Sequence, residues 1–190
     1  PVCSIEQKNN LGETYWQRKH QLPCIEVCLK HQCKLIDSET SFYSIQKHHF
    51  QAAEAVNKST RISSIFLSKY EHKLISLFYG LLELKNIKPC SNNQWTLFYK
   101  KLALDVYMMS SNYVDHKAVY HQLNHIFKDT LFEKYLPKSY DNGWLVDIFR
   151  KHRKSFHPIR HLMVWSTFIL DKSIEEIFML VRNFPKKYHS

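Results

Sequence analysis

Residues 28–31 read Cys28-Leu29-Lys30-His31, and this short stretch decides how the first part of the chain folds. A Cys-x-x-His pair is a usual half-site for structural zinc, because a tight turn lets two ligands reach one tetrahedral ion. The complementary half-site, Cys-x-x-Cys, is represented by Cys3, and its partner Cys would fall one residue before Pro1. The spacing therefore predicts a structural Zn²⁺ bound by Cys3, Cys28 and His31, with a Cys preceding Pro1 as the fourth ligand.

The composition around this motif bounds the class of protein. The chain has 190 residues, 44% of them hydrophobic and 14% aromatic, which is enough for one good-sized core or two small domains. Five Cys, three of them at positions 24, 28 and 33, do not resemble a disulfide framework and favour a reducing cytoplasm. No apolar run reaches the length of a bilayer span and no signal peptide opens the chain, so no membrane partner is expected. Because the chain lacks an initiator Met and opens inside a motif, we read it as a piece of a longer protein.

The charge balance is strongly basic. Lys and Arg together number 27 against 17 Asp and Glu, which gives a formal net charge of +10 at pH 7. Such a balance favours polyanionic partners, nucleic acid above all.

Beyond the Cys/His motif the sequence predicts helices. With three glycines the chain is poorly suited to a turn-rich all-β fold. Apolar residues recur at spacings of three, four and seven from about Ser59, which predicts a helical unit that ends at Pro89. Further helices are expected over about 95–109, where Ser91 offers an N-cap, and over 115–125, where Asp115 can cap the start. A helix over 144–153 follows the loop at 141–143, and two more are expected from Pro158, a first-turn Pro, and from the capping box at Ser173.

These patterns predict a mainly α fold. A small zinc-bound knuckle or ribbon head is expected over residues 1–37, and a connecting segment with a long helix over residues 38–90. A multi-helix bundle with a helix-turn-helix-like unit is expected over residues 91–190.

The helix-turn-helix interpretation rests on the segment from Phe149 to His161, which holds five Lys or Arg and no carboxylate. Two short helices around a polar turn with a basic rim resemble that motif. The second helix is too apolar to present polar side chains to base edges, so contacts to DNA phosphates are expected instead. The competing interpretation is a solvated basic face between two core helices. The residues predicted to bind phosphate are Arg150, Lys151, Arg153, Lys154 and Arg160.

A second basic candidate lies upstream, on the helix predicted over residues 95–109. Lys100 and Lys101 there are also candidates for nucleic-acid contact. A plain helical hairpin without nucleic-acid contact is the interpretation that the sequence favours for this region.

Three blocks of sequence, in order, are similar to the TniQ family, and within it to its longer, TnsD-like members. The first is Cys3 with Tyr15-Trp16-Gln17-Arg18, Leu22-Pro23 and Cys28-x-x-His31; the second is Gln94-Trp95-Thr96-Leu97-Phe98-Tyr99; the third is Ile148-Phe149-Arg150-Lys151-His152-Arg153-Lys154, with Trp165 downstream. The resemblance implies the same zinc ligands, Cys3, Cys28 and His31.

The resemblance also implies a function. It points to a DNA-binding adaptor of a bacterial cut-and-paste transposon, which binds a chromosomal attachment site on double-stranded DNA and recruits an AAA+ ATPase of the TnsC type. A cytoplasmic, nucleoid-associated protein follows from that role. The alternative is a protein-interaction module that docks on the ATPase or on an RNA-guided effector complex, with DNA binding located outside this chain.

No enzyme activity is predicted. The sequence contains no Gly-rich phosphate loop and no Gly-x-Ser-x-Gly elbow, and carboxylates are sparse around the basic region. Catalytic residues and a small-molecule substrate are therefore not expected.

Overall fold

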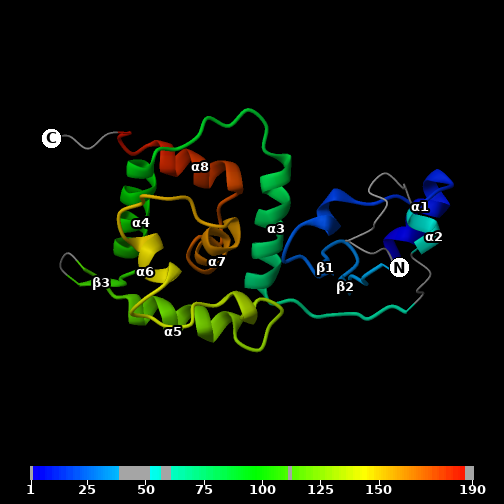
Figure 1. The fold of residues 1–190 in the computed structure, drawn as a ribbon, viewed down its shortest axis with the longest axis horizontal. Helices are drawn as coiled ribbons and strands as arrows, with labels where there is room; N and C mark the ends of the chain where they lie inside the picture. The colour runs from blue at the N-terminus through cyan, green and yellow to red at the C-terminus, as the bar shows by residue number, and fades with distance from the viewer. Residues whose placement is uncertain (1, 39–51, 57–60, 111–112, 187–190) are drawn as a thin grey trace, which may run out of the picture. The chain divides into compact units, whose positions relative to one another are not determined.

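The computed structural model describes residues 2–38, 52–56, 61–110 and 113–186 (Figure 1). This described part contains eight α-helices and four two-residue strands, so the prediction of a mainly α fold is confirmed. The chain divides into two compact units, residues 1–67 and residues 68–190. We call the first unit the head and the second unit the bundle.

The head is built from short elements around a small antiparallel ladder. Its elements are α1 (Val2–Leu11), the 3₁₀ helix η1 (Arg18–Gln21), β1 (Val27–Cys28), β2 (Cys33–Lys34) and α2 (Ala53–Val56). Cys28 lies opposite Cys33 in the β1–β2 pair. The chain returns to this ladder after residue 60, because the Lys34 amide donates to the Ser63 carbonyl at 2.9 Å and the Ile65 amide to the Gln32 carbonyl at 3.0 Å.

The helix predicted from about Ser59 is wrong over residues 61–68. Ser59 itself lies outside the described residues, and the segment that follows is extended until α3 (Lys69–Glu83) begins. Phe66 is 92% exposed and Ile62 is also exposed, so their helical spacing is not supported by a core. The backbone pairs with β2 instead, and Ser68 starts α3 through a reciprocal capping box with Glu71.

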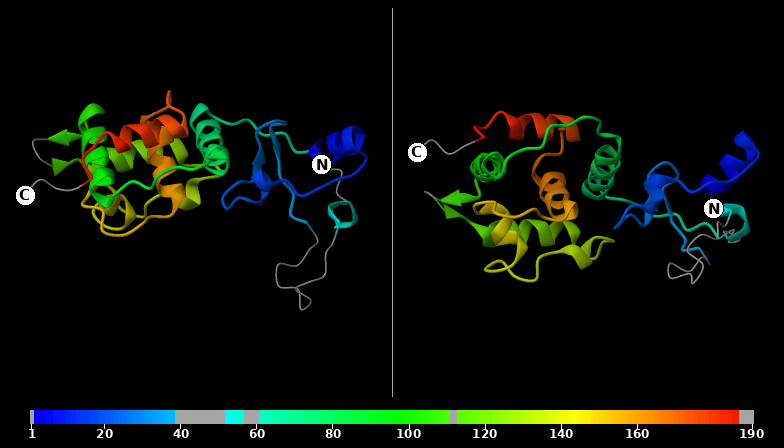
Figure 2. Two further views of the ribbon diagram at one scale, coloured as in Figure 1. Left: turned by 90° about the horizontal axis from the view of Figure 1, so that it is seen from above. Right: turned by 45° about the horizontal axis from the view of Figure 1, so that its top comes forward.

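The bundle follows from Ser68 (Figures 1 and 2). After α3 it contains α4 (Asn92–Asp105), the hairpin of β3 (Met109–Ser110) and β4 (Tyr113–Val114), α5 (His116–Phe127), the 3₁₀ helix η2 (Glu133–Tyr135), α6 (Trp144–Phe149), α7 (Pro158–Phe168) and α8 (Ile174–Arg182). Helix starts predicted from capping residues are confirmed at Ser91, Asp115 and Ser173, whose side chains each accept a backbone amide. Pro158 occupies the first turn of α7, also as predicted.

Helix α7 is the centre of the bundle. It packs on α3, α5 and α6, and Figure 1 shows it end-on between them. Seven of its eleven residues are buried, including the polar Ser166 and Thr167, whose hydroxyls donate to the Met163 carbonyl. A helix buried on this scale is a core element, as its apolar sequence indicates.

Helices α3 and α8 approach each other closely at Gly80. A Cβ added at Gly80 would lie 2.7 Å from Cγ2 of Ile174, so the two helices meet where α3 has no side chain. Glycine weakens a helix interior, and its presence here is explained by this close packing.

An aromatic and histidine cluster joins α4 to α7 inside the bundle. Trp95 stacks on Trp165 with ring centroids 5.8 Å apart, and the Tyr99 hydroxyl is hydrogen-bonded to Nδ1 of His161 at 2.6 Å. Burial, together with the nearby His152, lowers the pKa of His161 to about 3. His161 is therefore neutral at physiological pH and makes this hydrogen bond as an uncharged imidazole.

Helix α6 is shorter than predicted. The sequence predicts a helix over 144–153, whereas α6 ends at Phe149 and the chain from 150 to 157 is not helical. The reason is His152, which is buried and whose Nε2 lies 2.7 Å from the Ile148 carbonyl, an acceptor left free at the helix end. With a long connection and a buried α7, the helix-turn-helix-like interpretation is not confirmed.

Candidate metal site and basic surface

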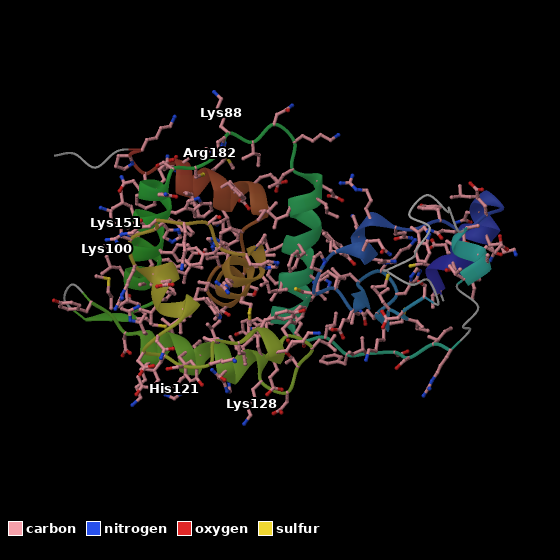
Figure 3. The ribbon with its side chains drawn as sticks, in the orientation of Figure 1. Lys88, Lys100, His121, Lys128, Lys151 and Arg182 are labelled. Carbon is pink, nitrogen blue, oxygen red and sulfur yellow. The ribbon has the colours of Figure 1, made fainter. Side chains whose placement is uncertain are left out.

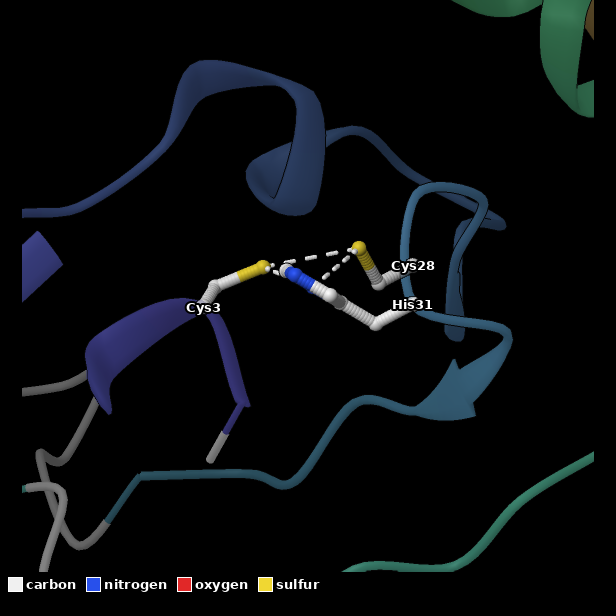
Figure 4. Close-up of side chains that lie close together, drawn as sticks. All are labelled: Cys3, Cys28 and His31. Carbon is white, nitrogen blue, oxygen red and sulfur yellow. Dashed lines mark hydrogen bonds between the residues drawn. The ribbon is translucent and has the colours of Figure 1, made fainter. Parts of the chain in front are cut away.

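Three side chains predicted as metal ligands come together in the head (Figure 4). Cys3 stands in the first turn of α1, Cys28 ends β1, and His31 lies in the turn between β1 and β2. Nδ1 of His31 is 3.0 Å from Sγ of Cys3 and 3.5 Å from Sγ of Cys28, and the two sulfurs are 3.5 Å apart. Within the described residues this is the one Cys, His or carboxylate group compact enough to hold a metal ion.

The orientation of His31 suits a metal ligand. Its Nδ1 faces the two sulfurs, while its Nε2 lies 3.2 Å from Oε2 of Glu6, one turn after Cys3 in α1. A carboxylate on the far nitrogen of a ligating imidazole fixes the ring and raises its basicity. Glu6 is not among the residues predicted for the metal site. Its i+3 spacing from Cys3 in a helix, which places both side chains on one face, could have indicated it.

The two thiols have opposite protonation preferences. Burial, together with the neighbouring Cys28, raises the pKa of Cys3 to about 12. Burial acts in the same direction on Cys28, but hydrogen bonds from His20, His31 and Cys3 outweigh it and lower the pKa of Cys28 to about 6. A proton on the pair therefore favours Cys3 over Cys28.

This donor set fits zinc. Two sulfurs and one imidazole are ligands that structural zinc sites use, and they leave one position of a tetrahedron. The fourth ligand expected before Pro1 lies outside the described residues. Nε2 of His20 is a further imidazole nitrogen 4.0 Å from Sγ of Cys3. Cys24 and Cys33 are not members of the group.

The second candidate site is a basic surface on the bundle. The amide of His152 donates to Oγ1 of Thr96 at 2.9 Å, which fastens the segment 150–157 to α4. Lys100 is one helical turn beyond Thr96, and Lys151 immediately precedes His152; both lysines are labelled in Figure 3. The two basic groups that the sequence presents separately are therefore neighbours. We define the basic surface as Lys100, Lys101, Arg150, Lys151, Arg153 and Lys154.

Some members of this surface are already paired. Nζ of Lys101 is 2.7 Å from Oδ1 of Asp105, and Nζ of Lys154 is 3.4 Å from Oδ2 of Asp147. All four side chains are well exposed, so these ion pairs are weak and leave both lysines open to exchange partners. Arg160 differs because it is half-buried, with its guanidinium 6.0 Å from the Trp144 ring centroid, and we place it outside the basic surface.

Among the described residues, the carboxylates of the bundle form no group compact enough to hold a metal ion. Asp115 caps α5 by accepting from the Ala118 amide at 2.9 Å, and Asp141 accepts from the Ser139 hydroxyl. No helix in the part of the chain described by the structure is long and apolar enough to cross a bilayer.

Together these features define a class of protein: an α-helical protein that combines a small Cys/His head with a cationic helical bundle. The sequence family described as Tn7-like transposition protein D, TnsD, matches residues 74–189. The chain belongs to this family, which confirms the resemblance stated from the sequence.

The similarity to one relative extends into the head. The chain is 31% identical over 174 residues to the transposon Tn7 transposition protein TnsD of Escherichia coli. The alignment covers 89% of this chain and 34% of that protein. The chain thus spans about a third of the length of its relative.

Proposed function

We propose that this chain is part of a target-selection adaptor of a bacterial transposon, and that its basic surface binds double-stranded DNA at a chromosomal attachment site. The observation that carries the proposal is the Thr96–His152 hydrogen bond, which brings the cations of α4 and of segment 150–157 onto one face. Membership of a transposition family and the net charge of +10 support it.

The expected mode of binding follows from burial. Helix α7 is the core of the bundle, so its side chains are not available to base edges. The exposed Lys and Arg side chains of the basic surface suit phosphate oxygens, which fix the position of a protein on a duplex without reading its sequence. Replacing counterions along the phosphates gives such binding a steep dependence on salt.

In this proposal the metal site is structural. Cys3, Cys28 and His31 would hold Zn²⁺, and the ion would supply a cross-link between α1 and the β1–β2 turn. Glu6 would keep the imidazole of His31 in place. No catalytic step is assigned to the ion or to any residue.

A second function is favoured by the surface of the head. Seven large apolar side chains in its described part are exposed: Ile5, Leu11, Tyr15, Trp16, Ile36, Ile62 and Phe66. Exposed apolar side chains of this size are typical of protein-interaction surfaces. We propose that the head contributes to recruiting the AAA+ ATPase of the transposon, or an RNA-guided effector if DNA binding lies elsewhere.

The test of DNA binding is a salt series with two labelled duplexes, one carrying the attachment site and one with that sequence scrambled. We compare the parent with the double variant Lys100→Gln/Lys151→Gln and with a matched control, Lys88→Gln/Lys128→Gln, which removes the same charge elsewhere on the bundle (Figure 3). The first variant should lose roughly two units of log–log slope, about one per phosphate contact, while the control should lose none.

The outcomes distinguish sequence recognition, phosphate contact alone and the absence of DNA binding. Tighter binding of the parent to the attachment duplex places sequence recognition in this chain. Equal binding to both duplexes with a steep slope leaves phosphate contacts alone here. Absence of binding, or equal slopes for both variants, would overturn the DNA proposal and direct the next assay to the ATPase.

A further inference from the structure

Two exposed tyrosines belong to the β3–β4 region of the bundle: Tyr107 lies just before β3, and Tyr113 is in β4. Tyr107 is 95% exposed and Tyr113 is 78% exposed, and in the part of the chain that the structure describes no hydrogen bond is recorded for either hydroxyl. Aromatic side chains of this size bury readily, so two at such exposure beside one hairpin have no structural role in the bundle.

The backbone at Tyr107 makes this choice of residue costly. The Tyr107 amide donates to the Leu104 carbonyl at 3.1 Å and the Met108 amide to the Ala103 carbonyl at 2.9 Å. These two bonds form a Schellman motif at the end of α4, with Tyr107 at the position that usually carries Gly. Tyr107 adopts φ +56°, the left-handed conformation that Gly tolerates and an aromatic residue does not favour. Neither packing against the described residues nor local geometry therefore explains a Tyr here, and such an outlier points to a functional role.

The hairpin stands next to the basic surface. It follows α4, whose last two turns carry Lys100 and Lys101, and it leads into α5 at His116. The His116 ring lies 6.4 Å from that of Phe149, edge to face, and burial followed by the nearby Arg150 charge lowers the pKa of His116. Arg150 is thus close to the base of the hairpin on one side, and α4 adjoins it on the other.

The carboxylates near the hairpin would repel an anionic partner only weakly. Asp105 is paired with Lys101, and Asp115 caps α5. Cations with adjacent exposed aromatic side chains match the chemistry of nucleic acid, in which phosphates alternate with sugars and flat bases. A two-stranded β-ribbon also has the width that the major groove of DNA admits.

We infer that Tyr107 and Tyr113, before and within the β3–β4 pair, are a second DNA contact and enter the major groove while the basic surface holds the flanking phosphates. This inference rests on the proposed DNA binding and adds a non-ionic contact to it. Tyrosine can meet a thymine methyl or a sugar with its ring and a base edge with its hydroxyl.

The test uses the variants Tyr107→Gly and Tyr113→Thr on a labelled duplex of mixed sequence across a salt series. Each should bind about tenfold more weakly than the parent with an unchanged salt slope, because a lost aromatic contact releases no counterion. Protection of guanine N7 from dimethyl sulfate, a major-groove probe, should also be lost. The melting temperature of Tyr107→Gly should not fall, since Gly suits the left-handed position. Met179→Ser, which alters an exposed side chain on α8, is the control and should bind like the parent.

The test distinguishes failure of the hairpin inference from failure of the proposed DNA binding. If both Tyr variants bind like the parent while Lys100→Gln/Lys151→Gln loses slope, the hairpin inference is wrong and the proposed function stands. If the parent itself does not bind the duplex, both are overturned. Weaker binding with a reduced slope would mean that the substitutions disturb the basic surface, and would also count against the hairpin contact.

Discussion

The head and the bundle are stabilised in different ways. In the described part of the head five apolar side chains are buried, and two of them are Cys28 and Cys33. The bundle buries apolar residues from each of its six helices, α3 to α8, around α7. Burial of apolar surface can therefore account for the bundle, whereas the head lacks enough of it.

This difference shows where each unit places its binding chemistry. The bundle buries apolar residues from all of its helices, and the cations of its basic surface stay exposed. In the head, Cys and His side chains take the place of a large core, and Cys28, one of its two buried cysteines, belongs to the group that would hold the ion. The following predictions test this division, from the largest expected effect to the smallest.

Removal of metal should unfold the head and spare the bundle. Structural zinc contributes on the order of 10 kcal/mol to the folding of small domains, more than the buried side chains of this head can replace. Cys28→Ser, or treatment with a chelator, should abolish amide-exchange protection in β1 and β2. Protection in α7 should be retained. Cys90→Ser, a free thiol in the bundle, is the control. Unchanged protection of β1 and β2 after complete zinc removal would show that the head has a sufficient core.

A cavity in α7 should destabilise the bundle and leave the head folded. Leu162 is fully buried, and Leu162→Ala should lower the free energy of unfolding of the bundle by about 2–5 kcal/mol. Denaturant unfolding followed by tryptophan fluorescence measures this loss, and zinc content measures the head. Leu104→Ala on the exposed face of α4 is the matched control and should cost far less. Loss of zinc in Leu162→Ala would mean that the two units do not fold independently.

The close approach of α3 and α8 gives a smaller effect within the bundle. Gly80→Ala gains about 1 kcal/mol of helix propensity but places Cβ against Ile174, and overpacking of this kind costs about 1–3 kcal/mol. We expect net destabilisation in thermal unfolding. The same substitution in an Ile174→Ala background should stabilise, because the opposing methyl is gone. A double-mutant cycle without coupling would contradict the contact.

Acid should weaken the bundle through His161. Its pKa is about 3 in the folded protein and near 6.5 when unfolded, so the unfolded state binds more protons between these values. The contribution of neutral His161 to the free energy of unfolding is complete above pH 6.5. It falls by about 1.4 kcal/mol per pH unit below that pH. Unfolding of His161→Gln at pH 7 and pH 5.5 should show a smaller loss than the parent. His121→Gln, an exposed histidine on α5, should follow the parent.

Local chemistry made much of this protein predictable. Ser91, Asp115 and Ser173 cap helices through hydrogen bonds that span three residues, and such bonds can be read from a short window of sequence. The grouping of Cys3 with the Cys28-x-x-His31 pair was also expected, since ligand spacing reflects the geometry of one ion.

Features that depend on distant partners were not predictable. The extended segment 61–66 forms because its backbone meets β2, and α6 stops at Phe149 because His152 is buried against α4. Apolar spacing in 61–68 could not reveal that those side chains face solvent. A helical period indicates a helix only when a core lies on one face.

The sequence by itself determined the family, the mainly α class, most helix starts and the three candidate metal ligands. The tertiary structure alone decided that Lys100 and Lys151 share one surface, that α7 is a core helix and that two tyrosines stand exposed beside the hairpin. The physical reason is the separation along the sequence of the residues that interact. Caps, turns and ligand pairs are set by residues a few positions apart. Which side chains face solvent together depends on packing between elements more than fifty residues apart, as in the bond between Thr96 and His152.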